Sequence, residues 1–145
     1  MNDACKTGDI SESIFATEAL RRGWWVYTSN GHARPADAII VRPPLRPITI
    51  QIKTATYYAD RDAYGVMACR GKGAVKMSYL KGDFDILAAW LPNVERFVFW
   101  RFDEIAERKK INYSPRLHRQ PDNWDLLEGS FADIITPHVT CPTCQ

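Results

Sequence analysis

The sequence predicts an α/β fold in which a mixed central β-sheet is flanked by helices. Three observations carry this prediction. Apolar residues recur at helical spacing over residues 11–23, strand-like runs follow over residues 36–55, and residues 83–100 have the pattern of a β-hairpin that leads into a second helix. A chain of 145 residues can enclose a hydrophobic core, so we expect one domain over residues 1–135 and a tail over residues 136–145.

The first helix is expected to begin at Ser11, whose hydroxyl suits an N-cap. Glu12 would then lie in the first turn, where the helix dipole favours an acid. Two cations and Gly23 are the expected end of the helix. The predicted buried face consists of Ile14, Phe15, Ala19 and Leu20.

The other elements follow in order. Trp24–Thr28 is rich in aromatic and β-branched residues and predicts a strand. The strands over 36–41 and 48–55 are joined by residues 42–47, which contain three prolines and two arginines that we expect to be solvated. The later expected elements are a short strand over 64–69, hairpin strands over 83–90 and 95–100, a helix from Asp103 to about Arg108, and a mixed closing segment over 124–135.

Two polar side chains interrupt the otherwise apolar strand over residues 48–55. Gln51 and Lys53 are two residues apart and share a face of that strand. Burying an amide or an ammonium group without partners costs several kcal/mol, on the order of 2–7 for the amide. Asp37 opens the preceding strand, so three polar groups project from adjacent strands. This cost is the reason to expect chemistry here.

Oxygen ligands for a divalent metal are available in the same region. Mg²⁺ prefers a few hard oxygen ligands and keeps several waters. The carboxylates of Glu12 and Asp37, the amide oxygen of Gln51 and the backbone carbonyl of Ile52 can supply them, and Mn²⁺ is the expected substitute ion. Lys53 can orient a water and offset charge on a phosphate. Oxygen ligands for a metal together with a nearby lysine suit the hydrolysis of phosphodiester bonds.

The order of these residues resembles the PD-(D/E)XK nuclease superfamily. The resemblance covers roughly residues 6–105, and the Gln-x-Lys form is similar to a small group typified by a cyanobacterial group I intron homing endonuclease. It implies a restriction-endonuclease-like core, a Mg²⁺-dependent endodeoxyribonuclease activity, and catalytic roles for Glu12, Asp37, Gln51 and Lys53. The segments that carry it are Gly8-Asp-Ile-Ser-Glu12, Leu20-Arg-Arg-Gly23-Trp24, Pro35-Ala-Asp37 and Gln51-Ile-Lys53-Thr-Ala.

Three functions stay open at this point. A homing or restriction-like enzyme would cut at a recognised DNA sequence. The order of acids and lysine also resembles archaeal-type Holliday junction resolvases, which recognise DNA structure. Gln51 is neutral where the superfamily usually has an acid, so a non-catalytic DNA-binding domain that retains the fold is the third reading. Because one active site cuts one strand, cleavage of both strands predicts a homodimer or homotetramer.

Clusters of basic residues supply the electrostatic argument for DNA. The formal net charge is only +2, so the argument rests on two stretches without acids, residues 70–81 and 108–119. A polar loop before Asp37 adds two further candidates. The expected DNA-binding residues are His32, Arg34, Arg70, Lys72, Lys76, Lys81, Arg116 and Arg119.

Each polar residue also has a structural interpretation. Glu12 can be an ordinary acid of a first turn, Gln51 a satisfied core amide and Lys53 a lysine at a sheet edge. Asp85 is interpreted as the start of its strand in preference to a site residue. Cys141 and Cys144 form half of a zinc site, so structural Zn²⁺ there is less favoured than a reduced tail. With four cysteines and no apolar run of membrane length, we expect a cytoplasmic protein without membrane association.

Overall fold

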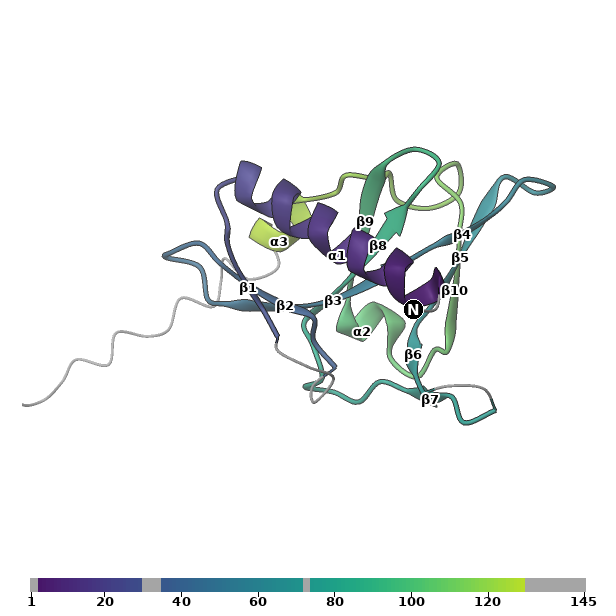
Figure 1. Cartoon of the computed structure of the whole chain (residues 1–145), viewed down its shortest axis with the longest axis horizontal. Helices are drawn as coiled ribbons and strands as arrows, with labels where there is room; N and C mark the ends of the chain where they lie inside the picture. Colours follow the sequence, from purple (N-terminus) through teal and green to yellow (C-terminus); the bar gives the residue numbers. More distant parts are fainter. Residues whose placement is uncertain (1–2, 30–34, 72–73, 130–145) are drawn as a thin grey trace, which may run out of the picture.

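The computed structural model describes residues 3–29, 35–71 and 74–129. It has the predicted α/β class, with a mixed central sheet and flanking helices (Figure 1). Its elements are α1 (Asp3–Arg21), β1 (Trp25–Thr28), β2 (Ala38–Val41), β3 (Ile48–Thr54), β4 (Thr56–Tyr58), β5 (Ala63–Met67), β6 (Cys69–Arg70), β7 (Met77–Ser78), β8 (Ile86–Leu91), β9 (Arg96–Arg101), α2 (Phe102–Ile105), β10 (Lys110–Tyr113) and α3 (Asp125–Gly129).

The central sheet has the strand order β1-β2-β3-β8-β9. Only its β3–β8 pair is parallel, with Ile50 opposite Ile86, and its other pairs are antiparallel. β8 and β9 form the predicted hairpin. A second sheet has the order β10-β5-β4, and β6 and β7 form a two-stranded ribbon. Ala55 alone separates β3 from β4, so one stretch of chain serves both larger sheets.

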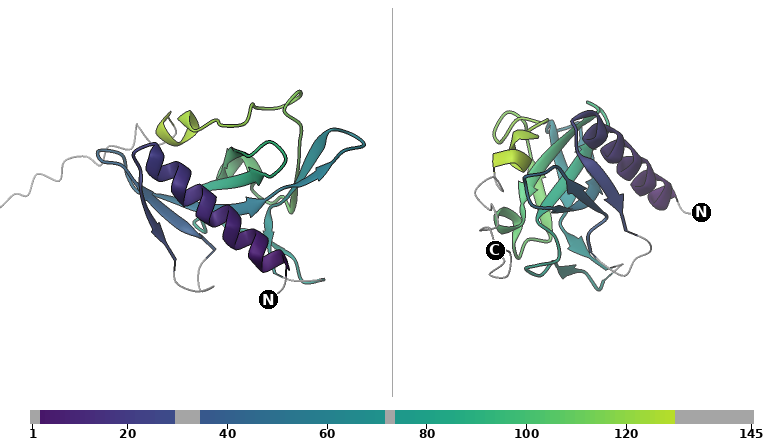
Figure 2. Two further views of the ribbon diagram at one scale, coloured as in Figure 1. Left: turned by 45° about the horizontal axis from the view of Figure 1, so that its top comes forward. Right: turned by 90° about the vertical axis from the view of Figure 1, so that its left-hand side faces the viewer.

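The two faces of the central sheet bury separate hydrophobic clusters. Alternate residues of β3, among them Ile50 and Ile52, pack with Phe15 of α1 on one face. Figure 2 shows α1 as a distinct layer on this side. The opposite face packs against the second sheet, with Leu87 of β8 in one cluster with Val66 of β5. No helix in the described residues is long and apolar enough to cross a membrane.

The first helix begins eight residues before its predicted start. Ser11 is not an N-cap but a buried residue within α1. Its hydroxyl lies 3.2 Å from the Thr7 carbonyl oxygen and 2.6 Å from the Thr54 hydroxyl, and this satisfied geometry lets a capping residue type occupy a helix interior. The predicted buried face is wrong at Leu20, which is exposed.

The predicted end of this helix is correct. Gly23 has a φ of +85°, the left-handed conformation that glycine adopts without steric cost. The N–H groups of Gly23 and Trp24 donate to the carbonyls of Leu20 and Ala19, both at 3.0 Å. These two bonds are a Schellman motif, and it turns the chain into β1.

Three later predictions need correction. The second helix begins at Phe102 and ends at Ile105, so Asp103 is inside its first turn and does not cap it. The short strand expected over 64–69 is divided between β5 and β6. The basic stretch 108–119 contains β10, which pairs with β5 and alternates exposed and buried residues from Lys110 to Tyr113.

The two arginines between β2 and β3 have partners rather than solvent alone. Arg42 donates to the Arg22 carbonyl and lies 2.7 Å from Glu128. Arg46 donates to both carboxylate oxygens of Asp85, each at 3.1 Å. Asp85 also accepts from the N–H and hydroxyl of Thr49, so it fixes the start of β8 against β3.

Acid should weaken the contribution of Asp85 to stability. Burial raises the pKa of this carboxyl, but the donors of Arg46 and Thr49 outweigh burial and hold the pKa below its ordinary value of 3.8. A lowered pKa means that this stabilisation is complete above about pH 4 and is lost as the pH falls through the folded-state value. We expect Asp85→Asn to lower the free energy of unfolding at pH 7 by about 2 kcal/mol and to flatten its decline below pH 4.

Urea unfolding monitored between pH 2 and pH 7 measures both effects. Asp9→Asn, an exposed change on α1, is the control and should follow the wild-type curve. An unchanged acid dependence in Asp85→Asn protein would contradict the assignment.

Candidate active site

One cavity brings together the residues that the sequence singled out as catalytic. It has a volume of about 440 Å³ and lies between the first half of α1 and the end of β3. Glu12 lines it from the helix, Asp37 from the start of β2, and Gln51, Ile52 and Lys53 from β3. Its remaining lining residues are Ala4, Thr7, Gly8 and Thr54.

The position of Glu12 follows from the helix period. Ala4, Gly8 and Glu12 are spaced by four residues and therefore form one row on α1, which is the row that lines the cavity. The contact between the Ser11 and Thr54 hydroxyls, at 2.6 Å, holds this part of α1 against β3. Because Ser11 also bonds the Thr7 carbonyl, its single proton is committed there and Thr54 is the donor between the hydroxyls.

Asp37 completes the hydrogen bonding of β3 just before β2 begins. Its backbone N–H donates to the Ile50 carbonyl at 2.9 Å, next to the Ala38–Ile50 pair of the ladder. Its Oδ2 accepts from the backbone N–H of Ile52 at 2.8 Å and from Nε2 of Gln51 at 2.6 Å. Asp37 therefore supplies the acceptor that a further residue of β2 would otherwise provide.

Gln51 is buried, and its amide is oriented by two acceptors. Nε2 lies 2.6 Å from Asp37 Oδ2 and 3.3 Å from the Ile52 carbonyl oxygen. The amide thus donates to two of the oxygens that were proposed as metal ligands. This arrangement satisfies a core amide, and a turn of the amide about its last bond would present the oxygen instead.

The donor set fits a hard divalent cation that is held weakly. Glu12, Asp37, Gln51 and Ile52 line the same cavity, and their carboxylate, amide and backbone carbonyl oxygens are of the types that Mg²⁺ accepts. Among the residues that the structure describes, no group of three His, Cys, Asp or Glu side chains could hold a metal ion. Glu12 and Asp37 are the acids in the lining of the cavity, and Gln51 is neutral.

Tyr79 belongs to the surroundings of Lys53, and the sequence did not indicate it. The Lys53 Nζ lies 5.7 Å from the centre of the Tyr79 ring. Burial raises the pKa of Tyr79, and the Lys53 ammonium opposes this shift without cancelling it. The phenol therefore stays protonated at neutral pH and can donate a hydrogen bond. Twenty-six residues separate the pair along the chain, so only the fold brings them together.

The expected DNA-binding residues are distributed unevenly. Lys76, Lys81 and Arg116 are exposed, and Arg70 is half-buried. Arg119 is engaged inside the fold, where it donates to the Phe99 carbonyl and pairs with Glu104. His32, Arg34 and Lys72, together with Cys141 and Cys144 of the proposed zinc site, lie outside the described residues.

Comparison with solved structures finds a similar fold. The structure of a bacterial homing endonuclease, I-Ssp6803I, superposes with a TM-score of 0.74 at 21% sequence identity, covering 89% of this chain and 97% of that chain. No protein-family model matches the sequence, and no curated protein matches it. The likeness shows the fold, a mixed central sheet with flanking helices.

An acid at position 51 should destabilise the metal-free protein and strengthen the binding of Mg²⁺. We expect Gln51→Glu to lower the free energy of unfolding without metal by about 2 kcal/mol, because a carboxylate replaces the donor to Asp37. With a third carboxylate, Mg²⁺ affinity should rise about tenfold or more. Calorimetric Mg²⁺ titration and urea unfolding with and without Mg²⁺ measure the two effects.

Gln120→Glu provides the matched control, since Gln120 is exposed and bonds only locally, to the Pro115 carbonyl. It adds the same charge and should change neither quantity. Unaltered Mg²⁺ affinity in Gln51→Glu protein would show that residue 51 does not contact the metal.

Proposed function

We propose that this protein is a metal-dependent DNA endonuclease that hydrolyses phosphodiester bonds at a recognised sequence, as a homing or restriction-like enzyme does. The observation that carries the proposal is the single cavity lined by Glu12, Asp37, Gln51, Ile52 and Lys53. The fold shared with a bacterial homing endonuclease supports it.

Each residue has a role in this proposal. Glu12, Asp37, Gln51 and the Ile52 carbonyl would hold Mg²⁺, or Mn²⁺ in its place. The ion would supply Lewis-acid stabilisation of charge and a more acidic water. Lys53 offsets the negative charge that grows on the phosphate as water attacks phosphorus and the bond to the leaving oxygen breaks. Tyr79, which is protonated beside Lys53, restricts where that ammonium can move.

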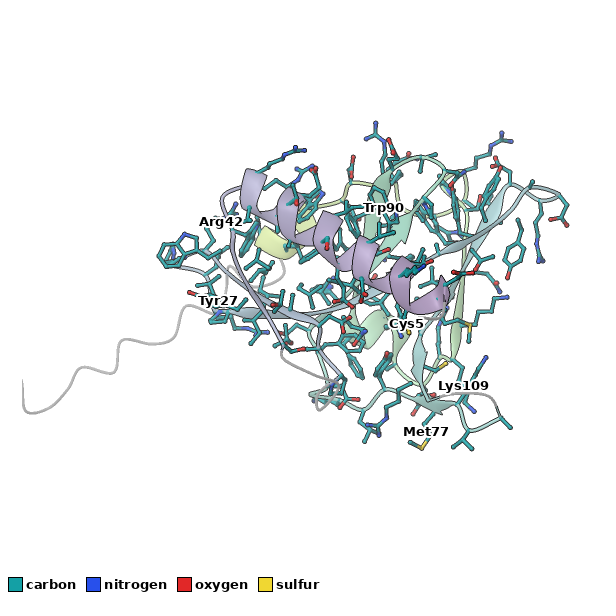
Figure 3. All side chains as sticks on the ribbon, in the orientation of Figure 1. Cys5, Tyr27, Arg42, Met77, Trp90 and Lys109 are labelled. Carbon is teal, nitrogen blue, oxygen red and sulfur yellow. The ribbon has the colours of Figure 1, made fainter. Side chains whose placement is uncertain are left out.

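Exposed cations would hold the DNA backbone. Lys76, beside β7, and Lys81 are exposed and are suited to phosphates. Figure 3 shows Met77 and Lys109 at the lower edge of the molecule, and the Ser78 hydroxyl donates to the Glu107 carbonyl at 3.3 Å, which joins these two segments. Arg70 and Arg116 extend the proposed set, and His32, Arg34 and Lys72 stay in it as proposals from the sequence.

Cleavage of both DNA strands would require more than one chain. The described residues contain one cavity with this set of groups, and one such site cuts one strand. We therefore propose that the protein works as a homodimer or homotetramer. A Holliday junction resolvase would need the same pairing of sites, so a junction remains the alternative substrate.

A non-catalytic DNA-binding domain is the second candidate, and one observation favours it. The Gln51 amide donates to Asp37 Oδ2 and to the Ile52 carbonyl, so these oxygens have a neutral partner within the fold. A protein that had lost its metal could keep this arrangement as a stable core. The two functions differ in whether Mg²⁺ or Mn²⁺ produces cleavage.

Loss of Asp37 or Lys53 should abolish most of the activity. We expect Asp37→Asn and Lys53→Met to reduce Mg²⁺-dependent nicking of supercoiled plasmid and of four-way junctions at least about 100-fold, by loss of charge stabilisation in the transition state. Circular dichroism and urea unfolding establish that each variant is folded.

Asp125→Asn and Arg21→Ala make the same changes of charge at exposed positions on α3 and at the end of α1 and should cut at the wild-type rate. Full activity in either site variant would refute the proposed site. Wild-type protein that binds DNA but cuts nothing with Mg²⁺ or Mn²⁺ would favour the non-catalytic domain.

Backbone contacts should appear in the salt dependence of binding. Each phosphate contact contributes about 0.9 to the slope of log affinity against log salt concentration. If Lys76 and Lys81 each hold a phosphate, the double alanine variant should reduce that slope by about 2 and weaken binding equally for preferred and random duplexes. Fluorescence anisotropy over a salt series measures this, and an unchanged slope would exclude both contacts.

A further inference from the structure

The three-stranded sheet has one face in the core and one on the surface. Its inward residues, such as Val66 and Ile111, pack beneath the central sheet. Figure 1 shows its β4–β5 hairpin projecting from the body of the molecule. The outward positions are Thr56 and Tyr58 on β4, Ala63, Gly65 and Met67 on β5, and Lys110 and Asn112 on β10.

Gly65 lets a tyrosine and a cation lie flat on this face. A Cβ at this position would come within 2.9 Å of both Tyr58 Cε2 and Lys110 Cε. The Lys110 Nζ lies 3.3 Å from the Tyr58 hydroxyl and 5.1 Å from the ring centre. The Arg61 guanidinium lies 4.5 Å from the same ring. Two cations therefore gather on one tyrosine, in the middle of the outward face.

The charges of this face suit a polyanion. None of its seven outward residues is acidic, and Arg108 and Lys109 precede β10. The β4–β5 turn does contain acids, but Asp62 is held by the Tyr57 hydroxyl at 2.9 Å and by Arg116 at 3.3 Å. The exposed Asp60 is the remaining acid of the turn. The cationic groups of Arg61 and Lys110 lie against the Tyr58 ring.

The side chains are also of the types that recognise bases. An Asn amide pairs with the major-groove edge of adenine, Lys and Arg with guanine, and apolar groups such as those of Thr56 and Met67 can contact the thymine methyl. Thr56, Gly65 and Asn112 are in one register row, and three strands span roughly 10 Å at about 4.8 Å per step. The major groove is about 12 Å wide, and β-strands are known to enter it.

We propose that the outward face of the β10-β5-β4 sheet reads base edges in the major groove of duplex DNA beside the cleavage site, with Asn112 as a sequence-determining residue. This inference rests on the proposed endonuclease function. β3 leads through Ala55 into β4, so Tyr58 is five residues beyond Lys53. The chain can span at most about 17 Å over that interval, which corresponds to roughly five base pairs. Adding the roughly 10 Å between β4 and β10, the bases read by Asn112 lie within about eight base pairs of the cut.

The experiment selects duplexes from a random library by binding to the full chain with Ca²⁺ and without Mg²⁺, and sequences the bound pool. Wild-type protein should show a preferred site. Asn112→Ala should lose the preference at one or two base pairs only, bind that site about tenfold more weakly, and keep the salt slope. Arg21→Ala, an exposed change at the far end of α1, should select the wild-type site. Lys110→Ala, which removes one cation of the face, should relax a neighbouring position.

The outcomes separate this inference from the proposed function. Identical selected sites for wild type and Asn112→Ala, or a uniform loss of affinity without a change of sequence, would overturn the reading face even if plasmid nicking is intact. If Asn112→Ala loses sequence preference at specific positions but the wild-type protein cuts no DNA, base reading by this face would be supported and the proposed endonuclease activity would be refuted. Failure of the wild-type protein to bind DNA would overturn both.

Discussion

The carboxylate of Asp37 holds together the part of the molecule on which its chemistry depends. One oxygen accepts both the Ile52 N–H and the Gln51 amide, at 2.8 and 2.6 Å. Without that acceptor, a buried N–H of the central strand would lack a partner, at a cost of about 1–3 kcal/mol. Asp37 also lines the cavity that we propose to bind a metal. A cation bound to Asp37 would therefore compete with two hydrogen bonds that stabilise the fold. The position of the Gln51 amide thus links the stability of the fold to the occupancy of the metal site.

Strand β3 links this site to both layers of the protein. Its apolar residues face α1, where Ile50 and Ile52 join the cluster around Phe15. Its polar residues Gln51 and Lys53 are on the opposite face, where Lys53 lies against Tyr79. They also border the cavity at the end of the strand, where the hydroxyl contact between Ser11 and Thr54 holds α1 and Glu12 nearby. The cavity thus results from a strand with two chemically different faces and a helix held at one point along it.

Much of this arrangement could be predicted from residue patterns, and the failures have physical causes. The alternating apolar residues of β3 and the Arg-Arg-Gly end of α1 predicted a strand and a helix end that the structure contains. The start of α1 was wrong because Ser11 is a common N-cap type, and only tertiary contact with Thr54 shows that it is buried. β10 was missed because its alternation of exposed and buried residues lies within a charged stretch. The contact of Lys53 with Tyr79 joins segments between which the chain forms strands β4 to β7, so no local pattern indicates it.

The direct passage from β3 to β4 through Ala55 sets a limit on how this chain can change during evolution. Side chains alternate along an extended strand, so inserting or deleting one residue there would exchange the faces of everything that follows. Tyr57, which now packs on Tyr64 at 5.0 Å, would turn outward, and Tyr58 would turn toward the core. Substitutions on the outward face leave this alternation intact. Homologues of this protein can therefore differ in the side chains that follow Ala55, but the number of residues between β3 and β4 is constrained.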